Sequence, residues 1–182
     1  MNTKSSGVTL LEMMIVLTIA SIIFLFATPS AQHLIAKSRI TAAVNDTSAL
    51  LQYARYMAVS KYKKIVICPT SNAIDCNLID WHLPLIVFQD DNYNGKRDLD
   101  EKILRRGLHA SAQVIVKGPK KRIAFQRGGS LSSPATINIC LKEKTQIYNR
   151  ALYVSLNGRI RLSKDTNGDS YHDNGYGKDA LC

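Results

Sequence analysis

The sequence lacks the short motifs by which many enzymes are first identified. It contains no GxSxG nucleophile elbow, no HExxH zinc motif and no P-loop. Its four histidines, at positions 33, 82, 109 and 172, lie far apart, and no CxxC pair or His/Cys spacing indicates zinc. We therefore expect a protein that is not an enzyme and needs neither a cofactor nor a metal.

Acidic residues are almost missing from one long stretch of the chain. Residues 102–164 hold fourteen Lys/Arg and a single acid, Glu143, within a chain of net charge +10. The flanking segments are acidic, with seven acids and two bases in 68–101 and four Asp and one Lys in 165–182. A long basic stretch favours a polyanionic partner such as DNA, although a solvated basic face without a partner explains it equally well.

Charge is also missing from the N-terminal run Val8–Thr28, in which Glu12 is the only ionisable residue. A helix of this length spans roughly 30 Å, the thickness of a bilayer's hydrocarbon core. The polar leader of residues 1–7 is too short for an ordinary secretory signal, and the plausible cleavage site follows Gly7, ahead of the apolar run. The sequence thus predicts a cleaved leader (1–7), a membrane helix (8–29) and a domain (30–182) outside the membrane.

The domain divides into one helical part and one β-rich part. After Pro29 an amphipathic pattern predicts that the same helix, kinked near the proline, continues to about Lys61–Lys64. Turn-forming residues then separate eight short β-rich runs. These are 64–68, 83–89, 102–107, 113–118, 122–127, 136–141, 151–158 and 159–163. We predict an α+β fold, with antiparallel sheet packed on the long helix and a flexible tail at 164–182.

Four cysteines in a chain carried across a bacterial membrane favour disulfides, because the periplasm is oxidising. Cys68 and Cys76 flank a turn-like segment, so local pairing favours a bond between them and leaves Cys140 to pair with Cys182. The sequence alone allows three connectivities. The favoured one predicts a tethered C-terminal tail.

The segment Gly7-Val8-Thr9-Leu10-Leu11-Glu12 resembles the prepilin peptidase site of type IV pilins and type II secretion pseudopilins. Pro29 also lies where many pilins have a helix-kinking proline, although Val8 stands where Phe is usual. The resemblance implies cleavage between Gly7 and Val8, and it implies that Glu12 pairs with the freed amine of a neighbouring subunit. It also implies a single-pass inner-membrane protein with a periplasmic domain, which reaches the cell surface when it assembles with other pilins.

A second resemblance narrows the family. CPTSNAIDC, Trp81 and LIVFQDDNYNGKRDLDEKILR, within residues 66–105, resemble the GspH/FimT group of minor pilins and pseudopilins. Gly158-Arg159-Ile160-Arg161 resembles the GRxR motif of the FimT branch, whose members bind DNA during natural transformation. The alternative is a minor pseudopilin at the tip of a type II secretion system, without DNA binding. A minor pilin that primes assembly or adhesion is a third possibility.

The residues themselves are suited to phosphate contact. Asn157-Gly158 predicts a tight turn, and period two on the next strand places Arg159 and Arg161 on one face, about 7 Å apart. Two guanidinium groups at this spacing can bridge neighbouring phosphates, and Gly158 would let backbone N–H groups approach one. Charges that merely protect an edge strand are the alternative explanation. Further basic residues of the predicted patch are Arg150, Lys142, Lys144 and Lys164.

The loop from Asp90 to Glu101 matches the EF-hand pattern D-x-N-x-N-G-x5-E. Arg97 stands at the position that is normally apolar, and a strand rather than a helix precedes the loop. Asp, Asn and Gly also suit tight turns, so a structural loop is the favoured interpretation. A calcium site remains the alternative here and in the acidic tail, which contains Asp165, Asp169 and Asp173.

Overall fold

A computed structural model describes residues 7–74, 76, 80–107, 111–119, 122–142, 146–173 and 182. The chain divides into two compact units, residues 1–37 and 38–182. Helix α1 (Leu10–Lys61) is continuous in sequence through both. Its last residue, Lys61, lies within the range Lys61–Lys64 that was predicted for the end of the helix. Among the described residues, α1 alone is long and apolar enough to cross a membrane, and its apolar part has no buried side chains.

Within the unit of residues 38–182, α1 buries one stripe of side chains. Its most buried residues include Ile40, Val44, Leu51, Ala54 and Ala58, which recur at spacings of three, four or seven. This spacing places them on one face of the helix, as the amphipathic pattern predicts. The two alanines are 0% exposed. This stripe is the helical side of the hydrophobic core.

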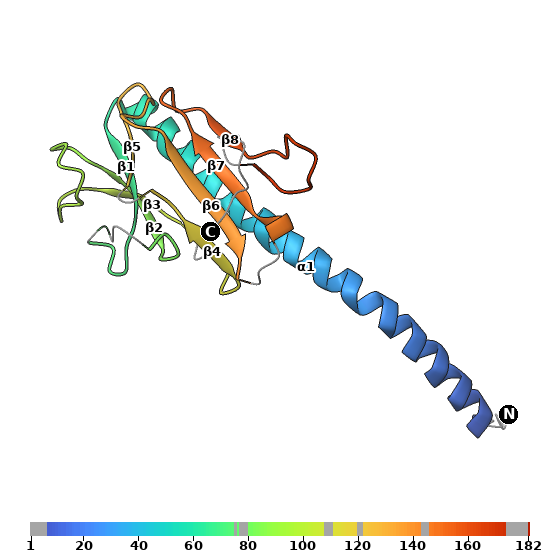
Figure 1. The fold of residues 1–182 in the computed structure, drawn as a ribbon. Coiled ribbons are helices and arrows are strands. Elements are labelled where there is room, and N and C mark those ends of the chain that lie inside the picture. The colour runs from blue at the N-terminus through green and yellow to red at the C-terminus, as the bar shows by residue number, and fades with distance from the viewer. Residues whose placement is uncertain are drawn as a thin grey trace. The chain divides into compact units, whose positions relative to one another are not determined.

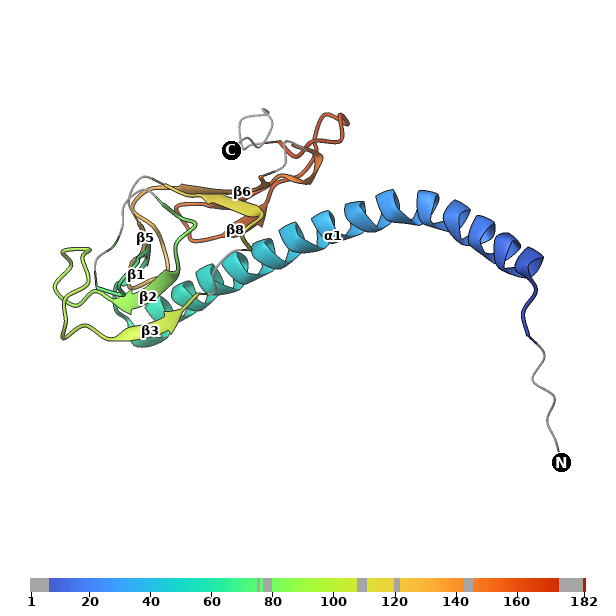
Figure 2. The same ribbon diagram turned by 90° about the horizontal axis from the view of Figure 1, so that it is seen from below.

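In the part of the chain that the structure describes, eight strands form two four-stranded antiparallel sheets, and all eight predicted strands are present (Figure 1). The first sheet has the order β3-β2-β1-β5, and the second has the order β4-β6-β7-β8. The strands are β1 (Ile65–Pro69), β2 (Leu85–Gln89), β3 (Ile103–Arg106), β4 (Val114–Lys117), β5 (Ile123–Phe125), β6 (Ala135–Leu141), β7 (Arg150–Val154) and β8 (Ile160–Leu162). Figure 2 shows β6 and β8 on one side of the second half of α1, while β3 crosses the helix near its C-terminal end in this view. The α+β prediction is confirmed.

The central strands supply the β side of the core. Every residue of β1 is buried, and so are Ile137 and Ile139 of β6 and Leu152 of β7. Trp81 is 2% exposed and donates from Nε1 to the carbonyl oxygen of Pro119 at 2.7 Å. The indole thus buries its ring while its N–H keeps a hydrogen bond.

Both predicted disulfides are present, Cys68–Cys76 and Cys140–Cys182. The first packs beside a buried cluster that contains Val66, Ile86 and Phe88. The second joins β6 to the last residue of the chain across 42 positions. It tethers the C-terminus to the second sheet.

Candidate functional site

The β7–β8 hairpin forms one edge of the second sheet, and it carries the predicted arginine pair. The register places Arg161 opposite Tyr153 and Ile160 opposite Val154. Arg159 immediately precedes β8, and both arginines are exposed. Ile160 is half-buried, whereas Leu162 is 45% exposed, so the apolar side of this short strand is only partly covered. Because β8 ends the sheet, protection of an edge strand also fits these charges.

Gly158 has a packing role that differs from the one expected. It is buried, and its N–H donates to the carbonyl oxygen of Ser155 at 2.8 Å inside the hairpin turn. The N–H of Gly158 itself is therefore engaged inside the turn. Its φ is +71°, and a Cβ atom there would lie 1.9 Å from the carbonyl oxygen of Gly129. Glycine is needed because two turns meet at this point without room for a side chain.

The structure adds two residues to the site that the sequence analysis missed. Arg55 and Tyr56 of α1 line an open groove with Arg159 and Ile160, and the groove has a volume of about 550 Å³. Arg55 donates from Nη2 to the carbonyl oxygen of Asn157 at 3.2 Å, which ties the helix to the hairpin turn. Nothing in the local sequence links positions 55 and 159. The only available signal is an exposed Arg-Tyr pair beside the buried helix stripe.

The other predicted basic residues lie away from the hairpin turn. Because β7 and β8 are antiparallel, Arg150 and Lys164 lie near the end of the hairpin opposite Arg159. Arg150 is half-buried and donates from Nη1 to the carbonyl oxygens of Ile147 and Asn149, and burial lowers the pKa of its guanidinium. Lys142 and Lys164 are exposed. Lys144 lies outside the described residues.

Part of the predicted tail folds back onto this end of the sheet. The N–H of Asp173 donates to the carbonyl oxygen of Lys164 at 3.0 Å, and the hydroxyl of Tyr153 donates to the carbonyl oxygen of Asp173 at 3.0 Å. Asp173 is buried, and hydrogen bonds from Thr166 lower the pKa of its carboxyl group. Residues 165–173 are thus hydrogen-bonded to the domain rather than free of it. Residues 174–181 lie outside the described part of the chain.

Within this segment, the pKa of His172 is affected by Arg150 at the start of β7. His172 Nδ1 lies 2.7 Å from the carbonyl oxygen of Ser163, an arrangement in which Nδ1–H donates. Burial, and next the positive charge of Arg150, lower the pKa of the imidazole, although the hydrogen bond to the Ser163 carbonyl, Asp165 and Asp173 act in the opposite direction. The net effect is a pKa of the imidazole below its ordinary value.

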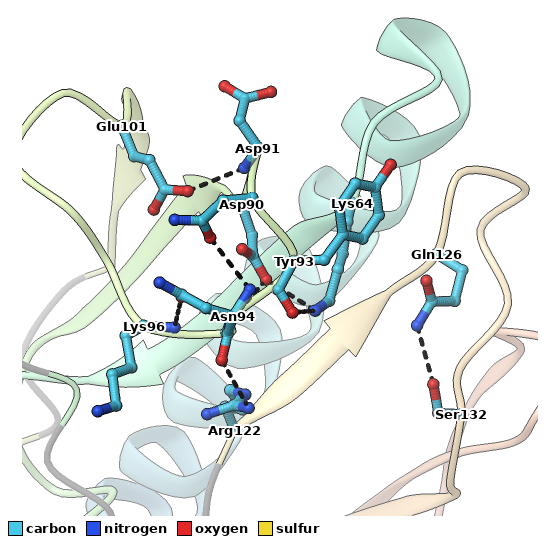
Figure 3. A network of polar contacts seen from close by, with 12 residues as sticks. Lys64, Asp90, Asp91, Tyr93, Asn94, Lys96, Glu101, Arg122, Gln126 and Ser132 are labelled. Carbon is cyan, nitrogen blue, oxygen red and sulfur yellow. Dashed lines mark hydrogen bonds and ion pairs between the residues drawn. The ribbon is translucent and has the colours of Figure 1, made fainter.

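The ammonium group of a lysine from outside the Asp90–Glu101 loop contacts residues of this loop. Lys64 is 8% exposed, and its Nζ lies 2.8 Å from Asp90 Oδ2 and donates to the carbonyl oxygen of Tyr93 at 3.0 Å (Figure 3). Gly95 N–H donates to the same carboxylate oxygen at 2.9 Å. The carboxylate of Glu101 accepts backbone hydrogen bonds within the loop. Among the residues that the structure describes, no three His, Cys, Asp or Glu side chains gather as a metal site.

The beginning of α1 has the geometry of a capped helix. Thr9 immediately precedes the helix, and its Oγ1 accepts a hydrogen bond from the backbone N–H of Glu12 at 3.3 Å. Thr9-x-x-Glu12 therefore has the spacing of a capping box. Gly7 and Val8 lie outside the helix and are exposed.

Comparison with known proteins places this architecture in a family. The family model "Type II transport protein GspH" matches residues 43–169, and the prokaryotic N-terminal methylation motif matches residues 2–28. No curated protein matches by sequence search. The family resemblance of residues 66–105 and the N-terminal motif are thereby confirmed.

Two crystal structures of the type IV minor pilin FimU of Pseudomonas aeruginosa are similar to this chain. One is 26% identical, with a TM-score of 0.55, over 75% of this chain and 93% of FimU. The other is 27% identical, with a TM-score of 0.51, over 68% of this chain and 92% of FimU. The minor pseudopilin EpsH of Vibrio cholerae is 13% identical, with a TM-score of 0.47, over 66% of this chain and 94% of EpsH.

Proposed function

The chain belongs to the GspH family of type II transport proteins, and from that premise we propose that it is a minor type IV pilin that binds extracellular DNA for uptake in natural transformation. The observation that carries this proposal is the pair of exposed guanidinium groups at Arg159 and Arg161, on an edge strand of a strongly basic stretch. Planar guanidinium groups bind phosphates through forked hydrogen bonds. Contacts of this kind carry little sequence preference.

The N-terminal unit serves delivery in this proposal. Prepilin peptidase cleaves after Gly7, and Val8 becomes the first residue of a helix that holds the protein in the inner membrane. Glu12 then pairs with the freed amine of a neighbouring pilin, because a lone carboxylate at membrane depth is costly. The domain lies in the periplasm until assembly places it on the pilus, and retraction by partner motors then draws the bound DNA inward.

A minor pseudopilin of a type II secretion system is the second candidate. The description of the matching family model favours it, and edge-strand protection would then account for both arginines without DNA. The two candidates differ in one measurable property, which is affinity for nucleic acid at low salt.

Fluorescence anisotropy with labelled duplex DNA and the full-length protein in a neutral detergent tests the proposal. We expect binding at low salt that weakens steeply as salt rises, by about 0.9 log unit per log unit of salt for each phosphate contact. Arg159→Gln/Arg161→Gln should weaken binding and reduce that slope by about two contacts. The matched control is Lys96→Gln/Lys102→Gln, which removes the same charge from exposed positions elsewhere.

Two results would overturn parts of the proposal. Absence of binding at low salt would refute DNA capture and favour the pseudopilin role. Equal loss of binding in both double variants would leave DNA binding in place but refute Arg159 and Arg161 as its site.

A further inference from the structure

The groove between α1 and β8 has an exposed aromatic ring and an exposed aliphatic side chain, which phosphate binding alone does not require. Its helix side consists of Gln52, Arg55, Tyr56 and Val59, and its strand side consists of Arg159 and Ile160. We propose that this groove seats an unpaired base of single-stranded DNA against Tyr56, while Arg55 and Arg159 contact the flanking phosphates. The inference rests on the proposed function and narrows the partner from DNA in general to single-stranded DNA.

The helix side of the groove is one coherent face. Gln52, Arg55, Tyr56 and Val59 follow the spacing i, i+3, i+4, i+7, which aligns side chains along a helix. This face differs from the buried stripe, because Tyr56 is 67% and Val59 is 53% exposed. An aromatic ring and an aliphatic side chain thus remain open to solvent beside two arginines.

The charges around the groove favour an anionic strand. Its lining contains two guanidinium groups and no acid. Arg55 is held in place by its hydrogen bond to Asn157, and Arg159 follows the same turn two residues later. Cationic groups beside an aromatic ring complement the alternation of phosphates and bases along a single strand.

A single strand fits this arrangement better than a duplex or an acidic peptide. Bases within a duplex are stacked on one another and cannot reach Tyr56 without being unpaired. The Asp and Glu side chains of an acidic peptide would use the arginines but have no aromatic ring to stack on the exposed tyrosine. Base–aromatic stacking accepts every base, so the groove adds affinity with little sequence preference.

The experiment compares two labelled strands of equal length and equal phosphate number, one of thymidines and one of abasic sites. Fluorescence anisotropy on the full-length protein in neutral detergent measures both affinities at one salt concentration. We expect the thymidine strand to bind roughly 5- to 150-fold more tightly, the range that stacking of one base provides. Tyr56→Ala should abolish this preference, Tyr56→Phe should keep it, and Tyr171→Ala, at an exposed tyrosine outside the groove, should leave it unchanged.

A second variant examines the phosphate contact. Arg55→Gln should reduce the salt slope by about 0.7, one phosphate contact to a single strand, while the preference for bases over abasic sites persists. Thermal unfolding of each variant, compared with that of wild type, shows whether the fold is retained.

The possible results separate the two proposals. Equal affinity of the wild type for both strands would overturn the base-binding inference and leave phosphate-based DNA capture in place. No affinity for either strand or for duplex DNA would refute both proposals. Binding of a poly-glutamate peptide that competes with DNA and depends on Tyr56 would overturn the inference in favour of an acidic peptide partner.

Discussion

At the scale of single residues, Gly158 shows how one position without a side chain determines the geometry of the candidate site. The hairpin turn that contains Gly158 lies in close contact with the turn of Gly129. The N–H of Gly158 donates a hydrogen bond inside the hairpin. Arg159 follows directly, so the position of its guanidinium depends on this close approach. We therefore assign Gly158 a positioning role rather than a contact with phosphate.

Replacing Gly158 should damage both stability and binding. In Gly158→Ala the new Cβ would meet the carbonyl oxygen of Gly129 at 1.9 Å, at a φ of +71° that alanine rarely adopts. We expect a loss of about 1–3 kcal/mol in the free energy of unfolding, measured with urea, and weaker binding of DNA at low salt.

Gly128→Ala is the matched control for this prediction, because a Cβ atom there meets no atom within 4 Å. We expect it to change the free energy of unfolding by less than about 0.5 kcal/mol. Equal stability of the two alanine variants would contradict the packing role assigned to Gly158.

At the scale of elements, the strands and the helix could be predicted because their signals are local. Apolar residues recur with the period of a helix up to Lys61 and with that of short strands afterwards, and turn residues separate the strands. The pairing of Cys68 with Cys76 could also be predicted, because the two residues are close in the sequence. The Arg159–Arg161 segment was predicted as an exposed strand for the same local reason.

The rest of the site could not be predicted, because it depends on contacts between distant segments. Arg55 and Arg159 are about a hundred positions apart, and only the packing of the hairpin against α1 brings them together. Gly158 has an ordinary turn signature, and the neighbouring turn of Gly129 gives it its tight constraint. Lys64 likewise pairs with Asp90 because β1 and β2 are neighbours in the sheet.

The disulfide that ends the chain should stabilise the second sheet. Cys140–Cys182 closes a loop across 42 positions, and the chain-entropy model gives about 4 kcal/mol for a loop of this length. We expect Cys182→Ala, at an exposed residue, to lower the free energy of unfolding by about 2–4 kcal/mol under non-reducing conditions.

Urea unfolding of wild type in the presence of a reductant provides the comparison. The bond that spans 8 positions constrains the unfolded chain less, so most of the loss on reduction should already be present in Cys182→Ala. An unchanged denaturant midpoint in Cys182→Ala would show that the tether contributes nothing to stability.

At the scale of the whole molecule, the basic residues have different roles. Part of the basic stretch serves structure, because Arg122 donates to the carbonyl oxygen of Asn94 and Arg127 donates to the hydroxyl of Tyr93. The acidic loop that they contact is further neutralised by Lys63 and Lys64. Among the described residues, the side chains of Arg159 and Arg161 form no ion pair, so these two arginines provide the better evidence for an external anion.

The N-terminal unit and the domain should accordingly be separable by mutation. We propose that Glu12 acts only in assembly, where it neutralises the amine of a neighbouring pilin. In Glu12→Gln that amine would be left unpaired in an apolar environment, at a cost of about 3–5 kcal/mol. We therefore expect roughly tenfold or greater loss of the variant from sheared pili, measured by immunoblot against total cell protein.

The same variant should bind DNA as tightly as wild type when purified in neutral detergent, because Glu12 belongs to the unit of residues 1–37 and the proposed DNA site belongs to the other. Arg159→Gln/Arg161→Gln should show the converse behaviour, with normal incorporation into pili and weakened binding. Normal incorporation of Glu12→Gln would refute the pairing role of the carboxylate. Failure of the arginine variant to enter pili would mean that the β7–β8 hairpin contacts neighbouring subunits, and that result would favour the structural role of a pseudopilin over DNA capture.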